Sequence, residues 1–198
     1  MARKDDREQR RREIADALLR VAGTGGLHAA TMRAVAAEAG VSLHLVQHYF
    51  ATKEQLMAFA LEQLVARMAD RLKERFAAIS PTPREVVEAV LVEALPTDAQ
   101  SRTFHLIYTS YAVLAMTDPA LAALPFLTAP DAMEEFIATQ LGKAGVAEPR
   151  LEAVALLAMS AGLSSGVLAG QRSADDALAA LRHQLDRLCP KDRPEDPS

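Results

Sequence analysis

Cysteine and tryptophan are nearly absent from this chain: its 198 residues include one cysteine, Cys189, and no tryptophan. A single cysteine excludes an internal disulfide framework and fits a reducing cytoplasm. No uncharged apolar run approaches the about 18 residues needed to span a bilayer, so we expect no membrane partner. The first residues, MARKDDREQRRRE, carry charges of both signs with no apolar segment after them, unlike a signal peptide. We therefore expect a cytoplasmic protein.

Residue patterns typical of enzymes are missing as well. The chain has no glycine-rich phosphate loop and no Cys/His cluster with metal-ligand spacing, and its five histidines are scattered. His44 and His48 lie four apart on a predicted helix and could hold a metal there, yet no carboxylate or cysteine nearby completes a ligand set. We therefore expect neither catalysis, nor a cofactor, nor a metal site.

The net charge of −4 is distributed unevenly along the chain. Residues 1–53 carry nine Lys and Arg against six Asp and Glu, a balance of +3, so the remaining residues carry −7. The basic arm at the N-terminus consists of Arg3, Lys4, Arg7, Arg10, Arg11 and Arg12. Such an arm is either a solvated helix end or, beside a DNA-binding motif, a contact to the backbone or minor groove. In the second case, binding should weaken as salt rises.

Two short helices joined by a tight turn are predicted between Thr31 and Phe50. Thr31 is a natural N-cap for an Ala-rich helix that ends near Ala39. Gly40 can adopt the left-handed conformation that ends a helix, and Ser42 caps the next helix two residues later. A turn this short forces the helices to cross steeply, which is the geometry of a helix-turn-helix.

The second of these helices has two different faces. Val46 and Phe50 lie four apart and can be buried together, whereas the opposite face has the width of a major groove and carries Leu43, His44, Gln47 and His48. The Gln47 amide can pair with adenine, and Leu43 or Leu45 could touch a thymine methyl. His44 and His48 could bind a base edge or a phosphate. Thr52 and Gln55 then have capping-box spacing, which predicts a new helix with Lys53 near a phosphate.

These residues also resemble a known family. The run from Arg12 to Leu56, with REIADALLRVAGTGG, TMRAVAAEAGVS and HYFATKEQL in that order, is similar to the DNA-binding domain of TetR-family transcriptional regulators. The chain departs from the family pattern at Leu43 to Gln47, where many members have small residues or glycine and then a tyrosine. The resemblance implies that Thr31, Arg33, Tyr49 and Lys53 hold the DNA backbone. It also implies a homodimer formed through the last two long helices.

The rest of the chain is predicted to be helical. A long helix from Thr52 to about Ile79 ends at Ser80-Pro81-Thr82-Pro83, since proline cannot continue a helix interior. Helical patterns follow at about 83–95, 98–117, 119–124, 130–144, 148–170 and 174–188. The expected fold is all-α, with about nine helices. It divides into a DNA-binding domain at 1–53, an effector-binding and dimerisation domain at 54–189 and a disordered tail at 190–198.

The middle of the chain is the candidate effector site. Aromatic, Met and polar residues gather there at helical spacing, a mixture typical of a cavity for a largely hydrophobic ligand, although plain core residues would look similar. The candidates are Arg102, Phe104, His105, Tyr108, Tyr111, Met133, Phe136 and Met159.

The last two predicted helices are the candidate dimer interface. Residues 151–170 are nearly all apolar or small, and the next helix carries a leucine stripe. An ordinary buried hairpin would fit, but we favour paired hairpins that form a four-helix bundle between two subunits. The candidate residues are Leu157, Ala161, Ser165, Leu168, Leu178, Leu181, Leu185 and Leu188.

Together these features predict a ligand-responsive transcriptional regulator, a dimeric repressor that binds a palindromic DNA operator. A small-molecule effector would shift the helix that begins at Thr52 and release the DNA. Two alternatives stay open: a DNA-binding activator or architectural protein without effector, and a helical carrier or catalytic protein with a vestigial helix-turn-helix.

Overall fold

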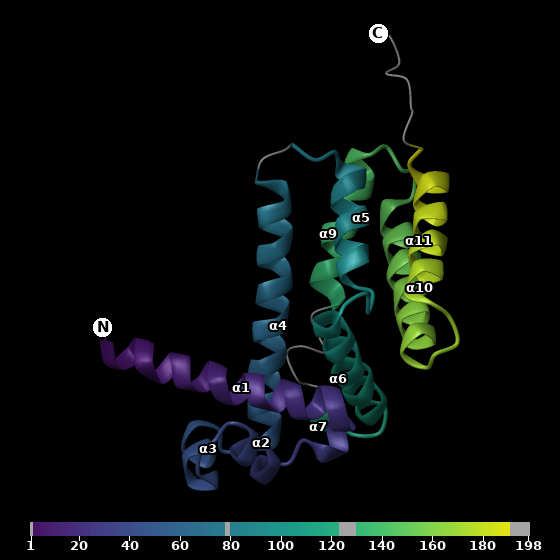
Figure 1. Ribbon diagram of the computed structural model, residues 1–198. Coiled ribbons are helices and arrows are strands. Elements are labelled where there is room, and N and C mark those ends of the chain that lie inside the picture. Colours follow the sequence, from purple (N-terminus) through teal and green to yellow (C-terminus); the bar gives the residue numbers. More distant parts are fainter. Residues whose placement is uncertain (1, 78–79, 123–129, 191–198) are drawn as a thin grey trace. The chain divides into compact units, whose positions relative to one another are not determined.

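The computed structural model describes residues 2–77, 80–122 and 130–190, which are helical with short connections and contain no strand. This confirms the all-α expectation (Figure 1). Two compact units form: the first combines Met1–Ala69 with Arg102–Thr128, and the second combines Asp70–Ser101 with Ala129–Ser198. Of the predicted tail, residues 191–198 lie outside the described residues.

The first unit contains the predicted helix-turn-helix. Its helices are α1 (Ala2–Ala29), α2 (Met32–Glu38), α3 (Leu43–Tyr49), α4 (Lys53–Phe76) up to Ala69, α6 (Ala99–Ala115) from Arg102 onward and α7 (Pro119–Ala122). Their shared core includes Ile14, Leu18, Val35, Val46, Phe50, Leu56, Leu61, Ile107 and Tyr111. Because Ile107 and Tyr111 of α6 belong to this core, the compact unit extends beyond the boundary predicted after residue 53. The functional division at that residue stays a prediction.

Helix α1 is longer than its sequence pattern indicated. Gly23, Gly25 and Gly26 are residues that commonly end a helix, but the helix continues to a kink at Gly26, whose φ of 74° is left-handed. Gly23 has a packing role instead, because a Cβ at this position would lie 2.9 Å from Oγ1 of Thr103 in α6. The missing side chain therefore lets α1 and α6 approach closely.

The second unit is a helical bundle. It contains the end of α4 with α5 (Pro83–Glu93), α9 (Pro130–Lys143), α10 (Pro149–Leu168) and α11 (Ala174–Leu188). Helices α9 and α11 both pack on α10 and α5. The core includes Val87, Leu91, Leu95, Ile137, Leu141, Leu156, Leu163, Leu181 and Leu185. Thr82 and Glu85 form a capping box in front of α5, where the proline-rich break was predicted.

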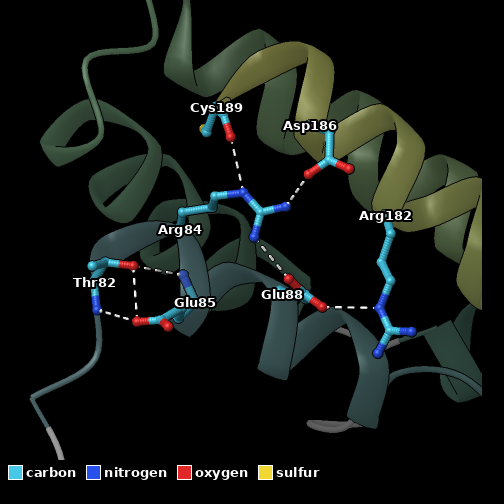
Figure 2. A network of polar contacts seen from close by, with 7 residues as sticks. All are labelled: Thr82, Arg84, Glu85, Glu88, Arg182, Asp186 and Cys189. Carbon is cyan, nitrogen blue, oxygen red and sulfur yellow. Dashed lines mark hydrogen bonds and ion pairs between the residues drawn. The ribbon is translucent and has the colours of Figure 1, made fainter. Parts of the chain in front are cut away.

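A buried arginine ties the start of α5 to the end of α11 (Figure 2). Arg84 is only 8% exposed. Its Nε donates to the Cys189 carbonyl at 2.8 Å, and its two terminal nitrogens bind Glu88, at 2.8 Å, and Asp186. Arg182 binds the other oxygen of Glu88 at 2.9 Å. Burial alone would raise the pKa of Glu88, but hydrogen bonds from Arg182 and Arg84 outweigh it, so the pKa is lowered.

Helix α10 meets the length and composition of a membrane span, contrary to our expectation. Its 20 residues contain a window of mean hydropathy 1.7, of which 39% is buried inside the structure. This finding alone is weak support for a membrane segment, because the core helices of soluble proteins have the same character. In this unit α10 contributes Ala153, Leu156, Leu163 and other side chains to the core.

Candidate nucleic-acid interface

The turn between α2 and α3 is built by the predicted capping residues. Thr31 Oγ1 accepts a hydrogen bond from the Ala34 amide at 3.1 Å, and Ser42 Oγ accepts one from the Leu45 amide at 3.1 Å. Gly40 has a φ of 66°, as a left-handed helix end requires. The amide of Val41 then donates to the Ala36 carbonyl at 3.0 Å. These bonds satisfy the helix ends and hold the two helices in a fixed turn.

Helix α3 buries one face and exposes the other. Val46 and Phe50 lie in the core, whereas His44, Gln47 and His48 are exposed. Leu43 and Leu45 are half-buried, and Leu43 packs against the core together with Tyr49. The exposed face is therefore more polar than the sequence alone indicated, because Leu43 turns partly inward. Of the candidate backbone contacts, Thr31 and Arg33 are exposed and Tyr49 is half-buried; Ser42, a further candidate DNA-binding residue, is exposed as well.

The start of α4 differs in detail from the prediction. Thr52 Oγ1 accepts from the Gln55 amide at 3.2 Å as expected, but Gln55 Oε1 accepts from the Ala51 amide, at 3.1 Å, rather than from that of Thr52. Lys53 Nζ donates to the Leu27 carbonyl at 2.9 Å, and partial burial lowers the pKa of its ammonium. Lys53 thus joins α4 to the end of α1, and its phosphate contact stays a prediction.

Several charged residues of the first unit form ion pairs with one another. Arg10 binds Glu13 at 2.6 Å and Arg11 binds Glu8 at 3.3 Å within α1. Two further pairs join helices: Arg20 to Glu38 and Arg67 to Asp16, both at 2.6 Å. Arg7 and Arg12 are exposed, and the side chains of Arg3 and Lys4 lie outside the described residues. The arm therefore offers fewer unpaired cations than its sequence suggests.

The candidate effector residues belong to both units. In the first unit, the Phe104 ring lies near two neighbours, stacked on Tyr108 with centroids 5.8 Å apart and edge-on to His105 at 5.2 Å. Arg102 is exposed, and burial raises the pKa of Tyr108. Tyr111 is a core residue whose pKa is raised to about 12, mainly by burial and further by Glu54. The second unit holds Met133, Phe136 and Met159: the first two are exposed, and the third packs against the core.

The candidate dimer residues need a correction. Leu181 and Leu185 are fully buried in the core of their own unit, so they cannot reach a partner without unfolding it. Leu157, Leu178 and Leu188 are half-buried against the same core, and Leu168 is half-buried as well. The stripe of α11 is therefore a core stripe, which burial in the same chain explains fully.

The exposed face of α10 is instead continuous and almost free of charge. Its residues recur every three to four positions and are Leu151, Val154, Ala155, Ala158, Ala161, Gly162 and Ser165. Leu151 is 67% exposed and Val154 is 45% exposed. Neither was among the candidate dimer residues, because α10 is apolar on nearly all sides and its hydrophobic pattern does not identify an outer face. Exposed apolar side chains beside small residues form a surface that another helix can approach closely.

No group of three or more His, Cys, Asp and Glu side chains that could hold a metal occurs within the described parts of the chain. His44 and His48 therefore have no third metal-ligating side chain of these types among the described residues. Their exposure on α3, beside Gln47, fits the edge of a nucleic-acid groove better than a metal site.

The chain is similar in sequence to known regulators. Residues 14–59 match the sequence model of the family described as bacterial regulatory proteins, tetR family, and residues 83–190 match that of the BetI-type transcriptional repressor C-terminal domain. The transcriptional regulator PksA of Bacillus subtilis is 38% identical over 51% of this chain and 49% of its own length. The regulator BetI of Rhizobium meliloti is 42% identical over 41% of this chain and 40% of its own length. The chain thus spans about half or less of the length of these two relatives.

Solved structures match over most of the chain. A transcriptional regulator of Rhodococcus sp. RHA1 is 30% identical, with a TM-score of 0.78 over 90% of this chain and 95% of its own. A regulator of Saccharomonospora viridis in complex with choline is 24% identical, with a TM-score of 0.79 over 90% of this chain and 96% of its own, and shows the shared fold. Because a BetI-type model covers more than half of the chain and a tetR-type model covers the helix-turn-helix, this chain belongs to the TetR family of bacterial transcriptional regulators.

Proposed function

We propose that this chain is a cytoplasmic, ligand-responsive repressor and not an enzyme. As a homodimer it would bind a palindromic operator and be released by a largely hydrophobic small molecule. The observation that carries this proposal is α3, a capped helix whose buried face is Val46 and whose exposed face is His44, Gln47 and His48. Such a helix can enter a major groove without disturbing the core, and its exposed side chains reach base edges.

The outer face of α10 supports the dimer. A surface that runs from Leu151 to Ser165 with apolar and small side chains on every exposed turn is unusual in a monomer. A twofold axis would bring the same face of a second copy against it, so that each subunit covers the other. Two copies of α3 would then reach successive major grooves about one helical turn apart, which requires an operator with approximate twofold symmetry.

Helix α6 supports the link between ligand and DNA. It carries Phe104, His105 and Tyr108, and on the same helix Thr103 lies close to α1 while Ile107 is in the core shared with α3 and α4. A ligand that displaces α6 would therefore act directly on the packing of the helix-turn-helix. A coupling of about 1–3 kcal/mol would change operator affinity about 5- to 150-fold.

The aromatic pair also suggests which ligands to test. Phe104 and Tyr108 present stacked rings beside His105, a surface suited to an apolar or aromatic compound. The faces of such rings also attract organic cations. Since a structural neighbour is a complex with choline, a quaternary ammonium compound is the first charged ligand to test beside uncharged hydrophobic ones.

The decisive experiment is selection of DNA from a random library by the purified full-length protein. We expect an enriched sequence with two inverted half-sites, and footprinting beside the protein's own gene should protect a similar sequence. No enriched sequence would refute the regulator, and an enriched sequence without symmetry would refute the dimeric mode. If no compound released the DNA, an activator or architectural role without effector would be favoured. Replacing Tyr108 by Ala should change release and leave ligand-free DNA binding intact.

A further inference from the structure

Arg11 is placed differently from the other arginines of the N-terminal arm. It lies three residues before Ile14 and seven before Leu18, which are both fully buried, so it continues the buried stripe of α1 by one turn. Its guanidinium carbon lies 4.1 Å from the centroid of the Phe59 ring and 5.3 Å from that of Phe50. Both distances are within the about 6 Å over which a cation is attracted to an aromatic face.

The two rings beneath Arg11 hold the end of the helix-turn-helix. Phe50 caps the C-terminus of α3, and its amide donates to the Val46 carbonyl at 2.9 Å. Phe59 belongs to α4, and the two rings are 5.5 Å apart, tilted by 49°. Both rings are buried, so Arg11 lies over an aromatic pair that joins α3 to α4. One side chain of α1 thus connects three helices.

The charge of Arg11 is also less available than that of its neighbours. Its guanidinium binds Glu8 at 3.3 Å and is half-buried, whereas Arg12 is exposed and no ion pair of it is seen among the described residues. A phosphate contact by Arg11 would compete with both the carboxylate and the rings. Arg12 has no such competition, which makes it a matched control one residue away.

We propose that Arg11 is a positioning residue, which sets the position of α3 through Phe50 and Phe59 and does not contact DNA. The idea rests on the proposed function, since it concerns the helix that would read the operator. If α3 tilts when Arg11 is lost, Gln47 and both histidines of its exposed face move together. Base-specific contacts then suffer, while contacts to the phosphate backbone are largely kept.

The test compares Arg11→Gln with Arg12→Gln in the full-length protein. Affinities for the selected operator and for random DNA are measured over a range of salt, with each protein corrected for its active fraction. Arg11→Gln should weaken operator binding roughly 3- to 10-fold, leave random DNA nearly unchanged and keep the salt slope. Arg12→Gln, if it loses a phosphate contact, should weaken both DNAs alike and reduce the slope by about one. Arg11→Lys should weaken operator binding less than Arg11→Gln does, because lysine retains a cation near the rings.

Two outcomes would overturn the proposal. If Arg11→Gln weakens both DNAs equally and reduces the salt slope, Arg11 is a phosphate contact. If it changes neither DNA, the contact with the rings has no role in binding. A loss of stability alone would lower the active fraction without changing the ratio of operator affinity to random-DNA affinity. This ratio therefore distinguishes an effect on the position of α3 from a general loss of stability.

A measurement without DNA tests whether Arg11 holds Phe50 in place, independently of the proposed function. Hydrogen exchange of the Phe50 amide should become roughly 3- to 10-fold faster in Arg11→Gln and stay unchanged in Arg12→Gln. Replacing Phe59 by Leu should also speed this exchange, and the double variant with Arg11→Gln should add little, because both changes remove one contact. Additive effects, or unchanged exchange in Arg11→Gln, would refute the positioning role even if the wild-type protein bound no operator.

Discussion

The close approach of α1 and α6 makes Gly23→Ala an informative change. The new Cβ would lie 2.9 Å from Thr103 Oγ1 and 3.6 Å from its Cγ2. Threonine is branched at Cβ, so a change of its χ1 rotamer would place another group near position 23, and relief of the contact requires a shift of α6 or a less favourable rotamer. Such overpacking typically costs about 1–3 kcal/mol. Replacing glycine by alanine inside a helix gains about 1 kcal/mol, which leaves a net loss of about 0–2 kcal/mol.

Removing the opposing side chain should reverse the sign of this effect. In a Thr103→Ala background the space opposite position 23 is open, so Gly23→Ala should stabilise the protein by about 1 kcal/mol. The interaction energy from the double-mutant cycle should then be about 1–3 kcal/mol. The four proteins would be compared by urea unfolding, with operator binding measured with and without ligand.

The same cycle tests the proposed link between ligand and DNA. Because Thr103 lies on the helix that carries Phe104 and Tyr108, a shift of α6 in Gly23→Ala should also change ligand-free operator affinity, and Thr103→Ala should restore it. Equal stabilisation by Gly23→Ala in both backgrounds would refute the α1–α6 contact. A large interaction energy between positions 23 and 103 with unchanged DNA affinity would refute the proposed link from α6 to DNA binding.

Three further predictions concern other parts of the molecule. Gln47→Ala should weaken the selected operator by about 1–3 kcal/mol and random DNA far less, and equal losses in a binding titration would remove Gln47 from base reading. Val154→Asp should give folded monomers in sedimentation, whereas Leu181→Asp should unfold the protein, because Val154 is exposed and Leu181 is fully buried. If the Val154→Asp protein still sedimented as a dimer, the interface would have to lie elsewhere. The pKa of Glu88 is lowered from 4.5, so its stabilisation is present above that pH and is lost as the pH falls through the lowered value. Glu88→Gln should therefore lower the urea midpoint at pH 7 and much less at pH 3, and the same difference at both pH values would contradict this assignment.

Local signals were enough to predict the helix-turn-helix. Thr31, Gly40 and Ser42 each act on a helix end within three residues of their own position, and a cap works in the same way in almost any context. The four-residue spacing of Val46 and Phe50 likewise identified the buried face of α3. The exception is Gly23, where a glycine that looked like a helix end is needed for packing against a residue 80 positions later.

Burial of the longer helices was decided only by the tertiary structure. The leucines of α11 form a stripe that could face either a partner or the chain's own core, and periodicity is identical in both cases; packing against α5 and α10 buries Leu181 and Leu185. Helix α10 is apolar on nearly all sides, so its hydrophobic pattern does not identify the exposed face. Packing against the neighbouring helices leaves Leu151 and Val154 exposed. The sequence placed Arg11 in a basic arm and Tyr111 in a candidate pocket and did not single out Arg84, but contacts with residues distant in the sequence determine the surroundings of each. Amino-acid type and spacing thus determined where most helices begin and end and which family the chain resembles, whereas the neighbours that only folding brings together determined which side chains remain available to DNA, ligand or a second subunit.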